Sequence, residues 1–221
     1  MSNWQENRKV VESYFEEQYN QELSIKETPW VTGAVGIVLL KKVISGKIDV
    51  GLKVLEIGCG VGTESVYLSR QGMDVTAVDF NENALNKAKH LAKFYSTDVD
   101  FIHEDFLEID IESISKNFDL VIDKNCFHHI PVSDRTKYAS NVFNILKKNG
   151  LFFLRGFSND IPPSKTGDGP FRLTSDDLIN TFKPFFIINE MYKFKNIPLP
   201  DESKEQIFWS FLGKKRDKKV E

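Results

Sequence analysis

The sequence predicts an α/β fold: a doubly wound, mostly parallel sheet of seven strands flanked by helices. From residue 53 onward, short apolar runs alternate with longer amphipathic segments, a pattern typical of parallel strands joined by crossover helices. The interiors of the first five short runs are apolar, as expected for strands covered on both faces. At 221 residues, the chain can bury a substantial core as one main α/β domain without metals or disulfides.

Two helices are expected before the first strand. Residues 7–19 carry apolar side chains at helical spacing, and the apolar segment 31–44 also suits a helix. We expect residues 1–48 to form an N-terminal helical cover over a main domain of residues 49–213, followed by a basic C-terminal tail of residues 214–221. This cover and the loop 159–170, rich in proline and glycine, are the expected lids.

The remaining elements follow from apolar runs and their flanking residues. Five strands are expected first, over residues 53–57, 74–79, 99–103, 118–123 and 151–157. Helices are expected between and after them, over residues 62–71, 82–94, 134–148 and 175–182, and Asn149-Gly150 is read as a helix stop. Two final apolar runs, 185–194 and 206–213, are expected to pair as an antiparallel end, so that the sheet has an antiparallel terminal strand.

Composition narrows the class of protein. The net charge of −3 and pI near 5.9 provide no general attraction for polyanions, so no nucleic-acid partner is expected. The start of the chain lacks a signal-peptide profile, and the longest apolar stretch is about half the ~20 residues that span a bilayer, which predicts a cytoplasmic protein without a membrane partner. Cys59 and Cys126 have no CxxC spacing, so neither a disulfide nor a metal site is expected. A monomer and a homodimer both remain open.

A glycine-rich loop follows the first predicted strand and opens the next helix. Gly58, Gly60 and Gly62 allow the backbone to approach a ligand closely, and this context favours nucleotide binding. Asp79 ends the next strand, where a crossover of this type places a carboxylate for two ribose hydroxyls. The alternative role for Asp79 is a helix cap ahead of Asn81.

The residues around this loop indicate which nucleotide is bound. Dinucleotide sites favour G-x-G-x-x-G/A, but here the final position holds Thr63 and the glycine falls one residue earlier, at Gly62. Glu56 stands beside the loop, where its carboxylate would repel a pyrophosphate and would attract a cationic amino-acid group. The charge therefore favours a sulfonium cofactor, S-adenosylmethionine.

The pattern Glu56-x-Gly58-x-Gly60-x-Gly62 with Asp79 resembles the first two motifs of class I S-adenosylmethionine-dependent methyltransferases, which have a Rossmann-like fold. The resemblance implies that Asp105 binds the adenine amino group and that Phe106 packs on the ring. It also implies that Cys59, through its backbone, and Phe80 lie against the cofactor, whose product is S-adenosylhomocysteine. Residues 118–123 and 146–151 match the fourth strand and the turn into the fifth.

Three further segments are similar to the thiopurine and thiol methyltransferase-like branch. These are Thr28-Pro29-Trp30, the stretch 123–131, and the stretch 169–173. The resemblance implies that Trp30 helps to close the cofactor site and that the acceptor is a small molecule. Here Asp-Lys-Asn at 123–125 replaces the Asp-Arg-Gly of that branch, which weakens the transfer of a particular substrate.

Methyl transfer is an in-line displacement, so alignment of donor and acceptor supplies much of the acceleration and a base is optional. Candidates for a base are Asp123, which also borders the cofactor, and the adjacent His128 and His129, for which ordinary loop packing is the alternative. Candidate substrate contacts are two loop aromatics and two arginines that suit an anion or an internal ion pair: Phe127, Phe171, Arg155 and Arg172.

Two other functions remain open at this stage. A nicotinamide-dependent oxidoreductase on a related sheet would need a Tyr/Lys-like catalytic pair, which we do not find. A noncatalytic protein that binds S-adenosylmethionine would retain the same motifs. The fourth-strand segment lacks the N-P-P-Y or D-P-P-Y type of motif carried by many methyltransferases that act on nucleic acids.

Overall fold

The computed structural model describes residues 3–20, 31, 33–111, 114, 117–162, 170–195 and 206–220. Its strands form a seven-stranded sheet of order β3-β2-β1-β4-β5-β7-β6, which confirms the predicted fold class. The chain folds as two compact units, Glu12–Ile109 and Met1–Val11 with Asp110–Glu221. The expected division into cover, main domain and tail stays a prediction.

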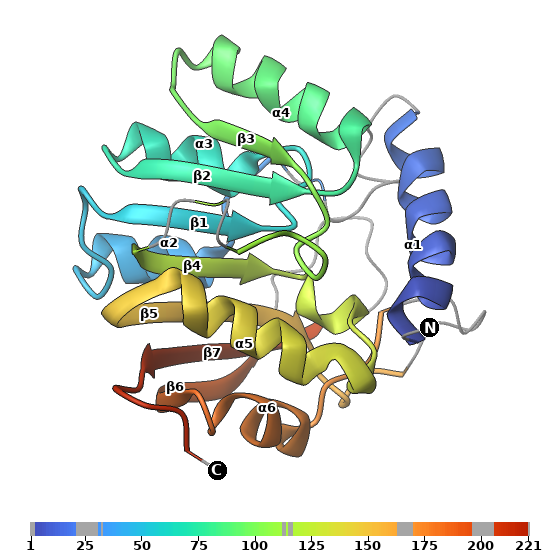
Figure 1. Ribbon diagram of the computed structural model, residues 1–221. Coiled ribbons are helices and arrows are strands. Elements are labelled where there is room, and N and C mark those ends of the chain that lie inside the picture. The colour runs from blue at the N-terminus through green and yellow to red at the C-terminus, as the bar shows by residue number, and fades with distance from the viewer. Residues whose placement is uncertain are drawn as a thin grey trace. The chain divides into compact units, whose positions relative to one another are not determined.

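The unit Glu12–Ile109 contains three parallel strands, β1 (Lys53–Ile57), β2 (Asp74–Asp79) and β3 (Asp100–His103). The crossover helices α3 (Thr63–Arg70) and α4 (Glu82–Phe94) pack against these strands (Figure 1). Helix α4 has the bounds expected from the sequence, because the Asn81 side chain caps it by accepting the Ala84 N–H at 2.9 Å. The parallel arrangement brings the carboxyl ends of β1 and β2 to the same edge.

Two helices precede β1, α1 (Asn3–Asn20) and α2 (Ile37–Ile44). Helix α2 starts six residues later than expected, because Gly33 adopts a left-handed conformation with φ 65° and Gly36, with ψ 126°, is not helical. The Gly36 N–H donates to Glu64 Oε1 at 3.0 Å and ties the start of α2 to α3. The existence of the two helices is confirmed, and their action as a lid stays a prediction.

The second unit contains β4 (Phe118–Lys124), β5 (Leu146–Phe157), β6 (Phe186–Lys195) and β7 (Ile207–Lys215). Strands β4 and β5 are parallel, and β7 runs antiparallel between β5 and β6 (Figure 1). The final two apolar runs thus pair as expected. The helices are α5 (Arg135–Ile145) and α6 (Ser175–Phe182), with 3-10 turns η1 (Phe127–His129) and η2 (Val132–Asp134) that sequence reasoning did not anticipate.

The boundary between α5 and β5 corrects one prediction. The helix expected over residues 134–148 ends at Ile145, and Leu146 already pairs with Phe118 as the first residue of β5. The pair Asn149-Gly150 is therefore an irregularity within the strand and not a helix stop, and Asn149 is left-handed with φ 63°. A Cβ at Gly150 would lie 3.1 Å from the Phe118 carbonyl oxygen, so the neighbouring backbone leaves little room for a side chain.

Alternation along β5 and β7 separates two faces of this part of the sheet. On one face, Phe152 and Phe211 pack against Phe182 of α6, with ring centroids 5.2 Å from Phe182 in both cases. Side chains at alternate positions point to opposite faces, so Arg155, Phe157, Phe208 and Ser210 lie on the other. This second face carries Arg155, one of the two arginines expected to contact substrate.

The chain end also differs from expectation. The sequence predicts a basic tail from residue 214 onward, but Lys214 and Lys215 belong to β7. Arg216 Nε donates to the carbonyl oxygens of Lys183 and Phe186 at 3.0 and 3.2 Å, and the Val220 N–H donates to the Pro184 oxygen at 2.9 Å. Pairing with β6 and the segment after α6 therefore orders these residues.

Within the described ranges, no helix combines the length and apolar character that a membrane crossing needs.

Candidate functional site

The predicted glycine loop joins β1 to α3. Gly58, Gly60 and Gly62 have φ angles of 65°, 53° and 74°, a left-handed region that is costly for residues with a Cβ. The Gly58 N–H donates to the Val78 oxygen at 2.8 Å and extends the parallel ladder beyond β1, and the Gly62 N–H closes a turn on the Cys59 oxygen at 2.9 Å. All three glycines are therefore required by the backbone path.

Asp79, at the end of β2, is buried and faces this loop. Its Oδ2 accepts the Gly60 N–H at 2.7 Å and its Oδ1 accepts the Asn81 N–H at 2.8 Å. Burial raises the pKa of the Asp79 carboxyl, although the hydrogen bonds from Asn81 and Gly60 oppose the shift. A carboxylate accepts about four hydrogen bonds, so its two oxygens retain capacity for ligand hydroxyls.

Helix α1 contributes aromatic side chains that sequence reasoning missed as site residues. A Cβ built at Gly60 would lie 2.9 Å from the Tyr19 hydroxyl, so this phenol stands directly against the loop. Phe15 stacks on Tyr19 at 5.9 Å and meets Phe80 edge to face at 6.2 Å. The only sequence signal for Phe15 and Tyr19 was helical apolar spacing, which does not distinguish core from site.

Two predicted loop residues, Glu56 and Cys59, are buried. The Glu56 carboxylate accepts a hydrogen bond from the hydroxyl of Ser65, in the first turn of α3, another residue that sequence reasoning missed. Cys59 packs with Ala77 and Leu85, with Phe101 against them. Its side chain therefore points into the core, as expected, and only its backbone is part of the loop.

The predicted adenine-binding pair follows β3 in the same unit. Asp105 and Phe106 are both buried. Asp105 Oδ1 accepts the Leu107 N–H at 2.9 Å, so the carboxylate holds the turn that presents the pair.

Trp30, with Thr28 and Pro29, lies outside the described residues. Among the residues that are described, no group of three or more His, Cys, Asp or Glu is arranged to hold a metal ion.

In the other unit, Asp123 ends the buried part of β4. Its carboxylate is fully buried and accepts the N–H groups of Cys126 and Phe127, each at 2.8 Å, and the hydroxyl of Tyr138 on α5. Burial raises the pKa of Asp123 to about 7, against the lowering effect of these three donors. Asp123 thus fixes the turn after β4, and Tyr138 is a partner that sequence reasoning missed.

His128 is a buried part of that turn. Its ring stacks on Phe157 with centroids 5.2 Å apart and planes 6° apart, and its Nδ1 accepts the Phe157 N–H at 3.2 Å. Burial lowers the pKa of His128 well below its usual range, and the charges of Arg172 and Arg155 act in the same direction. The ring is therefore neutral near pH 7, and its basic nitrogen is already engaged.

His129 is only partly buried. Its ring meets that of His128 edge to face at 4.7 Å. Burial, together with the charge of Arg172, lowers the pKa of His129 to about 4. This histidine is therefore a neutral, weakly basic group at pH 7.

The predicted substrate contacts occupy different environments. Phe127 lies in the loop after β4, as expected, but its ring is fully buried between Tyr138 and Phe182, with ring centroids 5.2 and 4.9 Å away, and so packs in the core. Phe171 is 41% exposed, and its N–H donates to the His128 oxygen at 2.7 Å. Arg155 lies over the Phe208 ring at 3.7 Å.

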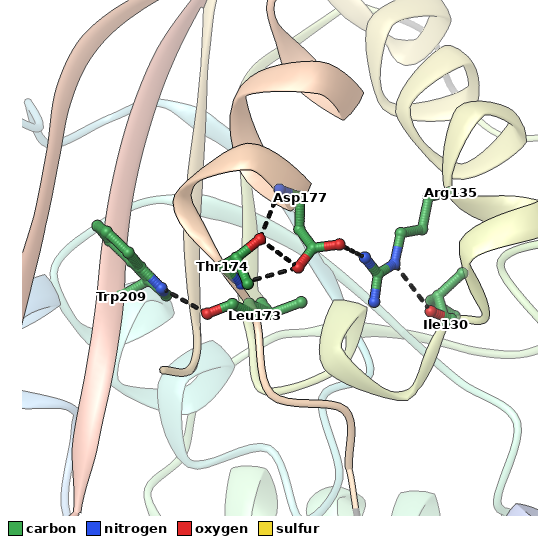
Figure 2. A network of polar contacts seen from close by, with 6 residues as sticks. All are labelled: Ile130, Arg135, Leu173, Thr174, Asp177 and Trp209. Atoms are coloured by element: carbon green, nitrogen blue, oxygen red, sulfur yellow. Dashed lines mark hydrogen bonds and ion pairs between the residues drawn. The ribbon is translucent and has the colours of Figure 1, made fainter. Parts of the chain in front are cut away.

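A buried ionic network supports this turn. Figure 2 shows Arg135, which donates from Nε to the Ile130 oxygen at 3.1 Å and forms an ion pair with Asp177. Asp177 and Thr174 form a capping box at the start of α6, which has the bounds expected from sequence. The Leu173 oxygen accepts Trp209 Nε1–H at 2.8 Å, so the network joins the turn after β4, the start of α6 and β7.

Comparison with known proteins identifies relatives of the central part of the chain. Residues 54–150 match a family model described as a methyltransferase domain. An uncharacterized methyltransferase of Schizosaccharomyces pombe is 33% identical over 105 residues, which cover 48% of this chain and 71% of the relative. The matched region includes the glycine loop, Asp79, Asp105 and the turn after β4.

Solved structures with the same fold extend over nearly the whole chain. The 1,6-didemethyltoxoflavin-N1-methyltransferase of Burkholderia thailandensis has a TM-score of 0.77 and 21% identity, over 98% of this chain and 92% of that one. The magnesium protoporphyrin IX methyltransferase of Synechocystis has a TM-score of 0.70 and 17% identity, over 95% and 97% respectively. At these identities the likeness shows the fold.

Proposed function

This chain belongs to the S-adenosylmethionine-dependent methyltransferase family, and we propose that it transfers the methyl group to a small-molecule nucleophile. The observation that carries the proposal is the hydrogen bond between Asp79 and the glycine loop. The Gly60 N–H donates to Oδ2 of this buried carboxylate at 2.7 Å. This arrangement combines a loop without side chains with a fixed acceptor of hydroxyl groups, as a nucleoside requires.

On the donor side, each residue has a distinct proposed role. Asp79 accepts the ribose hydroxyls with its remaining lone pairs, and Asp105 and Phe106 hold the adenine. Gly58, Gly60 and Gly62 admit the amino-acid part, with Glu56 as the anionic neighbour of its ammonium group. The closeness of Tyr19 to Gly60 supports the assignment of the glycine loop, because a side chain at position 60 would fill the space beside the Tyr19 hydroxyl.

S-adenosylmethionine supplies a methyl group whose bond to a sulfonium breaks as the new bond to the acceptor forms, leaving a neutral thioether. The chain's own task is to align the acceptor and to exclude competing water. Asp123 and His128 have their acceptor atoms engaged by the turn after β4, so we assign them to positioning. His129, neutral and partly exposed, is the better candidate to accept a proton.

We propose a thiol, a thiopurine-like heterocycle or a similar small nucleophile as the acceptor. A thiol is deprotonated readily near neutral pH, which fits a site whose histidines are weak bases. The segments at 28–30, 123–131 and 169–173 resemble the thiopurine and thiol methyltransferase-like branch, and the named substrate of the Burkholderia structure is also a small heterocycle. The net charge of −3 favours such acceptors over nucleic acid.

The test is transfer of radiolabelled methyl from S-adenosylmethionine to a panel of thiols, thiopurines, small amines, hydroxyl compounds and halides. We expect turnover with at least one thiol or thiopurine, and His129→Gln is expected to change the pH profile of kcat more than its value at high pH. Methylation of tRNA or DNA with no small molecule accepted would contradict the proposal.

A further inference from the structure

We propose that the methyl acceptor carries an anionic group, and that Arg172 binds this group beside the turn after β4. The inference rests on the proposed function and narrows its substrate class to a small organic acid, such as a carboxylate that also bears the nucleophile. All residues that carry it belong to the unit that contains Asp110–Glu221.

The guanidinium of Arg172 is held in place by backbone groups. Its Nε donates to the Pro162 oxygen at 3.1 Å and its Nη1 donates to the Pro170 oxygen at 2.9 Å. The same guanidinium lies over the Phe157 ring, 4.6 Å from the centroid. These contacts fix its plane and leave further N–H groups, including those on Nη2, available to a ligand. Such a planar fork matches a carboxylate better than it matches a neutral group.

The carboxylates that the structure describes in this region do not neutralise Arg172. Among the described residues, its polar partners are carbonyl oxygens alone. Asp160 forms an ion pair with Lys193 at 2.7 Å, and Asp177 pairs with Arg135. Asp123 is buried against the N–H groups of its own turn and Tyr138. A guanidinium that is partly buried without an anion is a recognition group for one.

The charge of Arg172 acts on the turn that we assign to the acceptor. It contributes to the lowered pKa of His129 and of His128, so its field reaches both rings. His128 is stacked on the same Phe157 ring that Arg172 covers. The guanidinium, the two imidazoles and the Phe157 ring therefore form one cluster, which is positively charged at neutral pH.

A buried hydroxyl on the neighbouring sheet face points to a missing partner. Ser210 Oγ, on a fully buried side chain, has no hydrogen-bond partner among the described residues. Ser210 is the register partner of Arg155 and lies on the sheet face that also carries Phe157 and Phe208. The Phe157 and Phe208 rings stack at 4.6 Å. An anionic ligand on this face would accept the hydrogen bond of the Ser210 hydroxyl, which is otherwise costly to bury without a partner.

The experiment compares two acids, thiosalicylate and thioglycolate, with their methyl esters. Wild-type protein is expected to show a kcat/KM for each acid about 10- to 100-fold above that for its ester, as hydrogen bonds to a charged group imply. Arg172→Met should remove this preference through KM with little change in kcat, whereas Arg172→Lys should retain part of it. The affinity for S-adenosylmethionine should be the same in all three proteins.

The matched control is Arg216→Met. Arg216 also donates to two backbone carbonyl oxygens, those of Lys183 and Phe186, so its loss reproduces the structural part of the Arg172 change. We expect it to leave the preference for the acids intact. An equal loss in both variants would show that Arg172 is structural, and weaker binding of S-adenosylmethionine to Arg172→Met would assign the arginine to the donor; either result overturns the proposal.

A binding readout separates this inference from the proposed function. S-methylthiosalicylate and its methyl ester are titrated by calorimetry into protein saturated with S-adenosylhomocysteine. Absence of methyl transfer to every acceptor would contradict the proposed function, yet a preference for the acid that disappears in Arg172→Met would still support anion recognition. Equal affinity for acid and ester, or no binding of the acid, would overturn it.

Discussion

The carboxylate of Asp79 accepts the backbone N–H of Gly60 at 2.7 Å, so the end of β2 fixes the conformation of the glycine loop after β1. Asp79→Asn would place an amide NH₂ against the N–H of Gly60 or Asn81. We expect the affinity for S-adenosylhomocysteine to fall at least about tenfold and the free energy of unfolding by about 1–3 kcal/mol. Calorimetry and urea unfolding measure these effects, and Asp74→Asn, at the exposed start of the same strand, should change neither.

Gly60 and Gly46 provide a matched pair for the loop. Both have positive φ, 53° and 69°, so alanine at either position has a similar backbone cost of about 1 kcal/mol. Only at Gly60 would the new Cβ meet another group, the Tyr19 hydroxyl at 2.9 Å, whereas Gly46 has no atom within 4 Å. Titration with S-adenosylmethionine should show a large loss for Gly60→Ala and normal affinity for Gly46→Ala. Comparable affinities in the two variants would show that the loop does not bind the cofactor.

Asp123 predicts a specific pH dependence of stability. Its pKa is raised to about 7 in the folded protein, so the folded state binds the proton more tightly than the unfolded state does. The stability that this proton supplies is fully present below the unfolded pKa, near 4, and is lost as the pH rises through about 7. Urea unfolding of wild type and Asp123→Asn isolates the effect. The free energy of unfolding of wild type minus that of Asp123→Asn should fall by roughly 1–4 kcal/mol between pH 4 and pH 8. A rise in this difference over the same pH range would mean that the three hydrogen-bond donors lower the pKa of Asp123 by more than burial raises it.

The Arg135–Asp177 pair predicts a contrast between partly buried and surface ion pairs. Arg135→Met leaves the buried oxygen of Ile130 without its donor and removes the cation from Asp177, which keeps its bonds to Thr174, and we expect a loss of about 1–3 kcal/mol in the free energy of unfolding. The control is Lys148→Met, which breaks a pair with Asp217 whose side chains are 77% and 75% exposed. Because solvent screens that pair, its loss should leave the urea midpoint nearly unchanged.

Local signals in the sequence predicted most of the fold. Helices α4 and α6 have the expected bounds because Asn81 and Thr174 cap them through side chains that act within one turn. The end of α5 was wrong because Leu146 pairs with Phe118, a contact that local periodicity does not encode. The inclusion of Lys214 and Lys215 in β7 was not predicted for the same reason, since it depends on their pairing with β6.

The candidate site divides in the same way. The glycines and Asp79 were predictable because one strand-loop-helix motif and the end of the next strand define them. Tyr19, Ser65 and Tyr138 occupy helix positions that look like ordinary packing, and only the fold brings them to Gly60, Glu56 and Asp123. The burial of Phe127 was not predicted because a 3-10 turn that buries its ring leaves no clear trace in the sequence.

The most direct test of the central claim is a calorimetric titration of the purified protein with S-adenosylmethionine, S-adenosylhomocysteine and NAD, each under the same conditions. We predict saturable binding of one equivalent of each sulfur nucleoside, weakened at least about tenfold in Asp79→Asn and unchanged in Asp74→Asn, and no binding of NAD. Binding of NAD in preference to S-adenosylmethionine, or unchanged affinity in Asp79→Asn, would contradict the assignment of the glycine loop and Asp79 to the methyl donor.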